Sequence, residues 1–318
     1  MRPVRILALT LLSVVALAGC SSPSGGAAGG AAPGAPGAPG AAPGAASGPS
    51  PGAPGTVVVG ASGSRQSRVL AEVYAQALAS AGFTVTTRLD VGGRATYLAE
   101  LRTGALDVVP DYLGALLRFY QPGSPETAPG AVAQALANYL PGDLSALDAS
   151  RAATTDTIVV SAASARRDSL TSIADLARLT GPIALAGPGG LAGDGHGPAA
   201  LRADYTLSIA RYDVTETSAQ ILAALGSGAD EAAILPASDP ALLTGGLVGL
   251  SDPRHAFLAE NVVPVVRGVA ATPRLRSVLN PVSAALSTAA LARMDQQVAA
   301  GADPAAVARA WLRAQGLA

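Results

Sequence analysis

Apolar residues follow two alternating spacings along most of the chain. Thr56–Val59 is a β-branched run typical of a buried strand, whereas the apolar positions within 67–81 recur at the spacing of a helix. Two more strands are predicted at 83–89 and 106–109, with a helix between them and another helix opening at Pro110. The order strand, helix, strand, helix, strand favours a parallel sheet with right-handed crossovers.

A second set of elements follows the first along the chain. Ser172 and Asp175 have the spacing of a capping box at the start of a helix. Apolar runs predict strands at 157–161, 183–186, 232–235 and 262–266, and helices at 218–225, 286–298 and 304–315. Because helices follow the last strand, we expect the chain to cross twice between two lobes, near residues 156–158 and 258–263.

The pattern as a whole predicts an α/β protein of two lobes with a double crossover hinge. Lobe I is expected to comprise residues 56–156 plus 262–318, and lobe II residues 157–261. Both lobes have the size of ordinary domains, and helices would flank a sheet in each.

The N-terminus is interpreted as a signal peptide over residues 1–20. Arg2 and Arg5 supply its positive region, and Ile6–Leu17 is an apolar region too short for a permanent transmembrane helix. It ends on Leu-Ala-Gly-Cys20, which resembles a bacterial lipobox and implies a lipid on Cys20; alternatively, the cysteine of an ordinary signal peptide is incidental. Residues 21–55, almost wholly Ala, Gly, Pro and Ser, are expected to form a disordered tether because they can bury little apolar surface.

Composition excludes several classes of function. All 21 basic residues are arginines, so sites that need the amine of a lysine, such as a P-loop or a Schiff base, are excluded. The formal net charge of -1, without a basic block, argues against a nucleic-acid binder. Two histidines and one cysteine are too few for an ordinary His/Cys zinc site, so we expect no metal or other cofactor.

In open α/β sheets, ligands bind outside the carboxyl ends of the strands. This rule places four loops around one cleft, at residues 61–66, 110–115, 187–197 and 236–239. The candidate ligand-binding residues in and beside these loops are Ser62, Gly63, Ser64, Asp111, Tyr112, Ala115, Thr157, Asp194, His196, Ser238 and Asp239. Two lobes on a hinge around a cleft favour closure on a ligand.

Several of these candidates have a structural alternative. Ser62–Ser64 precede a helix, where hydroxyls and backbone N–H groups suit an anion or polar oxygen, but a simple N-cap would use the same residues. Asp111 could accept from an ammonium or hydroxyl group, or cap its own helix. The glycine-rich loop, whose ionisable residues are Asp194 and His196, allows close approach of backbone to a ligand, or is a mobile surface loop.

The apparent lipobox, the tether and the two-lobed body together resemble extracytoplasmic solute-binding proteins of ABC transporters. The body, over 56–318, is similar to the glycine betaine/choline/carnitine (osmoprotectant) branch: Leu70–Tyr74 resembles its LGEMYAQ run and Pro110–Gly114 its YPEYTGT run. Further colinear matches are Gly92-Gly93, Leu101–Asp107, Ala224–Asp230, Ser238-Asp239, Leu250–Asp252 and Pro264–Arg267. The resemblance implies a periplasmic-binding-protein-like fold of type II with parallel-rich sheets.

The resemblance also implies a ligand site that can be compared position by position. The family holds quaternary ammonium groups in an aromatic cage, and it holds the carboxylate of its ligand with a lysine, a threonine and an arginine. Tyr112 matches a cage tyrosine. The other cage positions match Ile158, Leu222 and Pro236, while Ser62, Ala115 and Gly193 stand where the family has its lysine, threonine and arginine.

The sequence therefore predicts a non-enzymatic, monomeric receptor held outside the cytoplasm on the cell membrane by a lipid on Cys20. It would capture a small polar solute and deliver it to an ABC permease with its ATPase. A receptor-like sensor or scaffold without a transport role is the alternative. An envelope hydrolase is a weaker one, since residues 56–318 contain no G-x-S-x-G nucleophile motif and the only histidines of the chain are His196 and His255.

Overall fold

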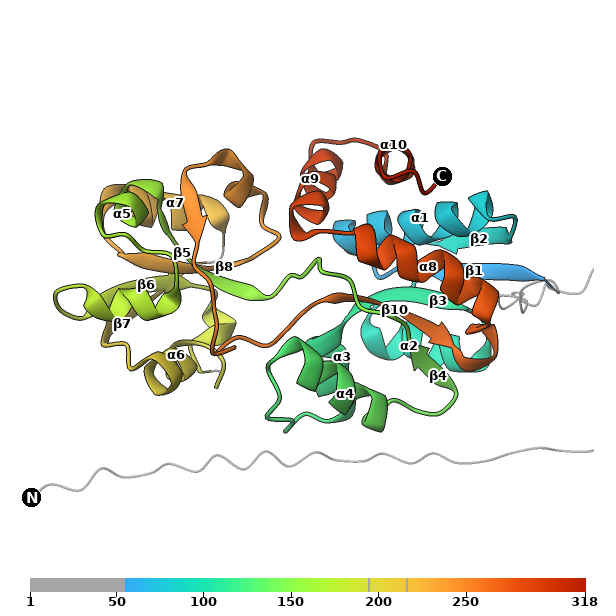
Figure 1. Ribbon diagram of the computed structural model, residues 1–318, viewed down its shortest axis with the longest axis horizontal. Helices are drawn as coiled ribbons and strands as arrows, with labels where there is room; N and C mark the ends of the chain where they lie inside the picture. The colour runs from blue at the N-terminus through green and yellow to red at the C-terminus, as the bar shows by residue number, and fades with distance from the viewer. Residues whose placement is uncertain (1–54, 194, 216) are drawn as a thin grey trace, which may run out of the picture. The chain divides into compact units, whose positions relative to one another are not determined.

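Ten strands form two five-stranded sheets in the part of the chain that the computed structural model describes, residues 55–193, 195–215 and 217–318 (Figure 1). The first sheet takes its strands from both ends of this part, and the second takes its strands from the middle. Each sheet is mixed, with two parallel and two antiparallel strand pairings. The prediction of an α/β protein is confirmed.

The first sheet has the strand order β2-β1-β3-β10-β4. Its strands are β1 (Thr56–Gly60), β2 (Thr84–Arg88), β3 (Val108–Tyr112), β4 (Leu144–Ala146) and β10 (Val262–Arg267). β1 pairs in parallel with β2 and β3, whereas β10 runs antiparallel to β3 and β4. The antiparallel entry of β10 places a late segment of the chain beside the end of β3.

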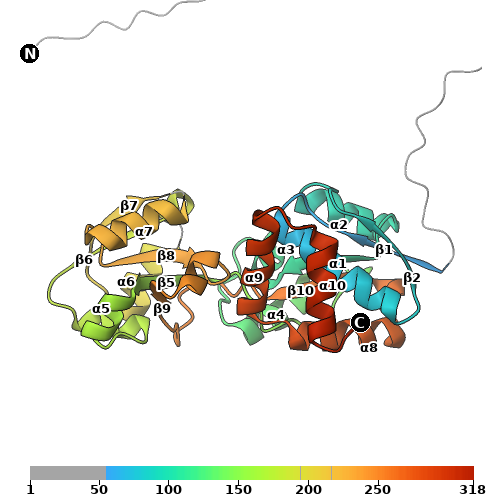
Figure 2. The same cartoon turned by 90° about the horizontal axis from the view of Figure 1, so that it is seen from above.

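Helices cover both faces of the first sheet (Figures 1 and 2). One face carries α1 (Arg65–Ser80), α8 (Pro273–Ala285), α9 (Thr288–Ala299) and α10 (Pro304–Ala314); the other carries α2 (Arg94–Thr103), α3 (Leu113–Tyr120) and α4 (Pro129–Tyr139). Val57 and Val59 pack into the apolar cluster under α1, whereas Val58 packs into the cluster on the opposite face, under α2. β1 is therefore buried on both faces, which explains its continuous apolar run. Within the described residues, no helix is long and apolar enough to span a bilayer.

The second sheet has the order β7-β6-β8-β5-β9. Its strands are β5 (Asp156–Ser161), β6 (Ile183–Gly187), β7 (Ile209–Val214), β8 (Ala232–Pro236) and β9 (Leu247–Gly249). Around it lie α5 (Ala162–Arg167), α6 (Pro198–Tyr205), α7 (Ser218–Ser227) and the 3₁₀ helices η1 (Ile173–Arg178), η2 (Gly189–Leu191) and η3 (Pro240–Thr244). A further 3₁₀ turn, η4 (Gly268–Ala270), follows β10. Separate apolar clusters on the two faces bury β5, β6 and β8.

Two backbone segments that connect the sheets run side by side. Ala153 forms an antiparallel bridge with Asn261, and the Thr154 N–H donates to the Glu260 carbonyl at 2.9 Å. The Glu260 N–H in turn donates to Thr155 Oγ1 at 2.8 Å. The second segment falls within the crossing predicted at 258–263, whereas the first lies just before the one predicted at 156–158, which is already the start of β5.

A buried carboxylate connects strands of the first sheet. Asp107, only 4% exposed, accepts the Val58 N–H through Oδ2 at 2.9 Å and Arg267 Nη2 through Oδ1 at 2.6 Å. Such charge-assisted hydrogen bonds satisfy a group that would be costly to bury alone. They attach β10 to the start of β3.

Two local predictions need correction. No helix opens at Pro110: β3 continues to Tyr112 because β10 pairs with it through Pro110↔Pro264 and Tyr112↔Val262, and α3 begins only at Leu113. The capping box of Ser172 and Asp175 is present, but it starts a 3₁₀ helix rather than an α-helix. The sequence pattern also missed β7, an edge strand with exposed polar positions and thus little apolar signal.

The close approach of α3 to the second connecting segment generates a stability prediction. A Cβ at Gly114 would lie 2.4 Å from Leu258 Cγ and 2.7 Å from the Ala259 carbonyl oxygen, so Gly114→Ala is expected to destabilise the protein by about 1–3 kcal/mol. The matched control is Gly226→Ala in α7, where a Cβ meets nothing within 4 Å and alanine favours the helix. Urea unfolding of both variants measures the difference; a Gly114→Ala protein as stable as wild type would contradict the prediction.

Candidate functional site

A cavity of about 660 Å³ lies at the carboxyl ends of β3 and β8 and at the N-terminus of α1. Its lining residues come from the loops after strands of both sheets, from a connecting segment and from α9. They are Gly63, Ser64, Arg65, Gln66, Tyr112, Thr154, Pro236, Ser238, Asp239, Pro240 and Asp295. Three of the four loops predicted to surround a cleft are thus found together.

A chain of hydrogen bonds joins the two sheets across this cavity. The Tyr112 hydroxyl donates to Gln66 Oε1, and Gln66 Nε2 donates to Ser238 Oγ at 3.3 Å. Tyr112 ends β3, Gln66 is in the first turn of α1, and Ser238 follows β8. Burial raises the pKa of Tyr112 above its ordinary value, so its hydroxyl stays a neutral donor. The Gln66 side chain therefore links a residue of the first sheet to a residue that follows a strand of the second.

The residues before α1 act as a cap and also contribute to the cavity. Ser64 is the N-cap: its Oγ accepts the Ser67 N–H at 3.1 Å and lies 3.3 Å from Ser62 Oγ. The Ser62 N–H donates to Ser67 Oγ at 3.0 Å. Gly63 and Ser64 line the cavity, whereas Ser62 is not among its lining residues. The N-cap alternative is confirmed for Ser64.

The charged lining residues are one arginine and two aspartates. Arg65 Nε lies 3.5 Å from Asp295 Oδ1. Asp239 caps η3, accepting the Ala241 N–H through Oδ1 at 2.8 Å and the Ser218 hydroxyl through Oδ2 at 2.5 Å. Asp239 is thus held by hydrogen bonds while it remains on the cavity wall.

Asp111 is not among the lining residues of the cavity, and its buried carboxylate forms an ion pair with Arg94. Arg94 Nη2 donates to Asp111 Oδ1 at 2.8 Å, and the Tyr97 hydroxyl donates to Oδ2 at 2.8 Å. The Tyr112 N–H donates to Oδ1 at 2.8 Å. Burial and the neighbouring carboxylate both raise the pKa of Tyr97. Asp111 is neither a cap of α3 nor a lining residue; it fixes the backbone at Tyr112.

Ala115 is occupied by a structural contact as well. Its N–H donates to Glu260 Oε2 at 3.0 Å, at the first turn of α3, and it does not line the cavity. Burial raises the pKa of Glu260 to about 7, while the Ala115 N–H and Arg94 oppose this shift and Asp111 adds to it. Glu260 is consequently a carboxyl group that titrates close to neutral pH.

The remaining candidates lie away from the cavity or outside the described residues. The Thr157 hydroxyl donates to the Leu250 carbonyl at 3.1 Å within the second sheet. His196 lies before α6 and is not a lining residue, and Asp194 and Cys20 are outside the described residues. Of the positions matched to a cage, Ile158 is buried in the core, Leu222 is 40% exposed, and Pro236 lines the cavity.

Tyr205 in α6 and Tyr212 in β7 do not supply further aromatic rings to the cavity. The Tyr205 hydroxyl donates to Asp252 Oδ1 at 2.5 Å, and the Tyr212 hydroxyl donates to the Pro188 carbonyl at 2.8 Å. Neither residue lines the cavity. Within the described residues, no group of His, Cys, Asp or Glu side chains is placed to hold a metal ion.

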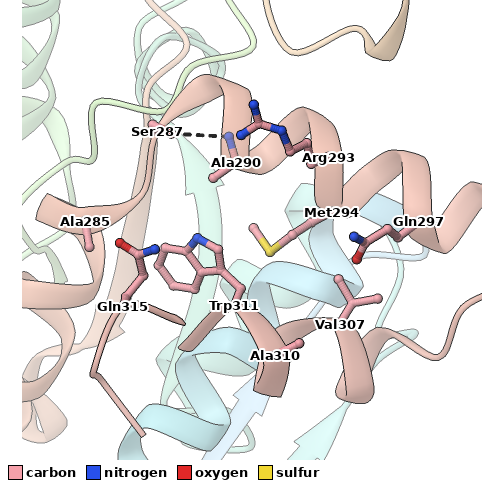
Figure 3. A pocket seen from close by; sticks show the side chains of 10 residues that line it. All are labelled: Ala285, Ser287, Ala290, Arg293, Met294, Gln297, Val307, Ala310, Trp311 and Gln315. Carbon is pink, nitrogen blue, oxygen red and sulfur yellow. Dashed lines mark hydrogen bonds between the residues drawn. The ribbon is translucent and has the colours of Figure 1, made fainter. Parts of the chain in front are cut away.

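A second cavity, of about 370 Å³, lies between α9 and α10 (Figure 3). Met294, Val307 and Trp311 point into it, and Arg293 and Gln315 lie near it. Trp311 also packs against the apolar core between α1, α8, α9 and α10 and the first sheet. None of its lining residues belongs to the second sheet, and none of them also lines the cavity at the strand ends.

Six lining residues were not among the candidates predicted from the sequence: Arg65, Gln66, Thr154, Pro236, Pro240 and Asp295. Gln66 falls in the predicted 61–66 loop, so the rule that ligands bind outside the carboxyl ends of strands could have identified it. Asp295 comes from α9, whose sequence gives no sign that one of its faces meets the strand ends.

Comparison with known proteins adds independent findings. The profile of the family described as substrate binding domain of ABC-type glycine betaine transport system matches residues 55–314. Apo YehZ from Escherichia coli is 24% identical with a TM-score of 0.71, covering 83% of this chain and 99% of that one. A structure described as a glycine betaine/carnitine/choline ABC transporter is 18% identical with a TM-score of 0.73, covering 82% and 99%. No curated protein matches the sequence.

The titration of Glu260 generates a pH prediction. The folded state raises the pKa of the Glu260 carboxyl to about 7, so the folded protein binds this proton more strongly than the unfolded chain does. The free energy of unfolding of the wild type therefore falls as pH rises through this value. Glu260→Gln should therefore gain stability relative to wild type between pH 5 and pH 8, by on the order of 1–3 kcal/mol. Urea unfolding at both pH values tests this; a variant whose stability difference from wild type is the same at pH 5 and pH 8 would refute it.

Proposed function

Because the chain belongs to the family of substrate-binding domains of ABC-type glycine betaine transport systems, we propose that it captures a small polar solute in the cavity at the strand ends and delivers it to a membrane permease. The fold is α/β and periplasmic-binding-protein-like, of type II. Members of this family are non-enzymatic components of transport. The partners we assign are the solute and an ABC permease with its ATPase.

The hydrogen-bonded chain Tyr112–Gln66–Ser238 is the observation that carries the proposal. It connects side chains from both sheets over a cavity large enough for a small solute. A solute between them would contact both sheets at once, and binding would favour the arrangement in which they approach. Both sheets present the carboxyl ends of strands to the cavity, where ligands of open α/β sheets bind.

The paired connecting segments are the proposed hinge. We assign residues 56–156 plus 262–318 to lobe I and residues 157–261 to lobe II. Ala153–Thr155 and Glu260–Asn261 would absorb the change in backbone angles when the lobes close. Only a few hydrogen bonds join the two segments, so such a motion would leave both sheets intact.

The proposed site of action is the outer face of the cell membrane. The sequence of residues 1–20 supports export and a lipid on Cys20, and residues 21–55 would tether the monomeric receptor to this anchor. The receptor could then meet its permease in the same membrane.

Solute capture predicts stabilisation by ligand. In a thermal unfolding panel of glycine betaine, choline, carnitine, glycine, ethanolamine and sorbitol, we expect at least one solute to raise Tm. A ligand at about 100 times its Kd adds roughly 2.7 kcal/mol to the free energy of unfolding, which is readily measured. Gln66→Leu should reduce this shift, whereas Gln296→Leu, at an exposed position on α9, should preserve it. If every solute leaves Tm unchanged at millimolar concentration, the receptor role fails.

Lipid anchoring predicts a change of location. Expressed as the full chain in a bacterium that processes lipoproteins, the wild type should fractionate with membranes. Cys20→Ala should abolish the membrane-bound processed form, because the thiol that would carry the lipid is absent, while Ser21→Ala should leave it unchanged. Metabolic labelling with a fatty acid and membrane fractionation measure both. Labelled Cys20→Ala protein in the membrane would disprove this anchor.

A further inference from the structure

The cavity walls contain few aromatic rings and many hydrogen-bond acceptors. Tyr112 is the one aromatic residue among its described lining residues. A quaternary ammonium group has no N–H and is attracted mainly by ring faces within about 6 Å, which a single tyrosine supplies on one side only. A cation in this cavity would instead meet oxygen atoms from both sheets.

The charge of the lining favours a cation. Arg65 is the positive lining residue, and Asp239 and Asp295 are negative. The Arg65 side chain is 61% exposed and the Asp295 side chain 14% exposed, so water competes for the arginine of this pair more than for the aspartate. Asp239 has no arginine beside it in the described contacts; its partners are the Ala241 N–H and the Ser218 hydroxyl.

The acceptor geometry favours a cation that donates hydrogen bonds. A carboxylate can accept about four, and Asp239 accepts two from its neighbours, which leaves capacity toward the cavity. The Tyr112 hydroxyl uses its proton on Gln66 Oε1, so toward a ligand its oxygen acts as an acceptor. Ser238 Oγ, on a buried residue of the same wall, adds another oxygen.

We propose that the cavity selects ammonium compounds that carry N–H bonds, such as primary amines and their zwitterions, over their fully methylated counterparts. The inference rests on the proposed capture of a solute in this cavity. When a solute displaces water, the Asp239 carboxylate loses solvation and requires both a counter-charge and hydrogen-bond donors. An N–H-bearing ammonium supplies both, a quaternary ammonium supplies only the charge, and an uncharged polyol supplies only the donors.

The test uses two matched ligand pairs, glycine with glycine betaine and ethanolamine with choline, whose members differ only in three N-methyl groups. Isothermal titration calorimetry of the purified protein at neutral pH measures each Kd, with sorbitol as the uncharged comparison. We expect the N–H-bearing member of at least one pair to bind at least about tenfold more tightly than its methylated partner, since hydrogen bonds to charged groups are among the stronger ones.

Asp239→Asn tests whether the Asp239 carboxylate recognises the ammonium group. It should weaken binding of the N–H-bearing ligand by about tenfold or more, because the amide keeps the cap but loses the charge. The matched control is Asp303→Asn, which changes the same residue type at the N-cap of α10, away from the cavity, and should bind like wild type. The Tm of both variants without ligand verifies that they are folded.

The possible outcomes distinguish a failure of the preference for N–H groups from a failure of solute capture. If neither pair shows the N–H-bearing member binding at least about tenfold more tightly than its methylated partner, the preference for N–H groups is overturned while solute capture stays in place. Binding of sorbitol alone does the same. Unchanged affinity in folded Asp239→Asn removes Asp239 as the recognising group and overturns the inference. If the protein binds no solute of the wider panel, the proposed function fails and the inference with it.

Discussion

The first turn of α3 is held by the chain as it returns from the second sheet to the first. The N–H groups of Leu113 and Gly114 donate to the Asn261 and Ala259 carbonyls at 3.0 Å each, and the Ala115 N–H donates to Glu260 at 3.0 Å. These are donors that a helix leaves unpaired at its N-terminus. Their satisfaction fixes the start of α3, and with it Tyr112, directly beside the proposed hinge. Gly114 has to be glycine because the returning backbone occupies the space of a Cβ.

The electrostatic groups around Tyr112 divide into two sets with different roles. Behind it, Asp111, Arg94 and Tyr97 satisfy one another in a buried network that orients the backbone. Breaking such a network leaves an uncompensated charge, so these groups stabilise structure and are unsuited to exchange partners with a ligand. In front of it, Gln66, Ser238 and Asp239 retain hydrogen-bonding capacity toward a cavity. The residues that position the site thus pair with one another, whereas those that can bind line the cavity.

The sequence was most informative where packing dictates residue type. Strands buried on both faces gave continuous apolar runs, and Gly104 and Gly228 terminate α2 and α7 in left-handed conformations that glycine favours. Tyr112 and Ser238, which both line the cavity, were candidates because they lie at or just after the ends of predicted strands. The ion pair of Asp111 could not be predicted, because a carboxylate beside Tyr112 looks the same in sequence whether or not an arginine 17 residues earlier is paired with it. Asp295 had no local signal at all, since only tertiary packing brings α9 to the cavity.

The central claim is that a solute binds between the strand ends of the two sheets. A crystal structure of the protein grown with its tightest ligand from the panel tests it most directly. The account predicts ligand density in contact with Gln66, Ser238 and Asp239, with Tyr112 against it. Ligand density confined to another place, such as the α9–α10 cavity beside Trp311, with the strand-end cavity holding only solvent, would contradict it.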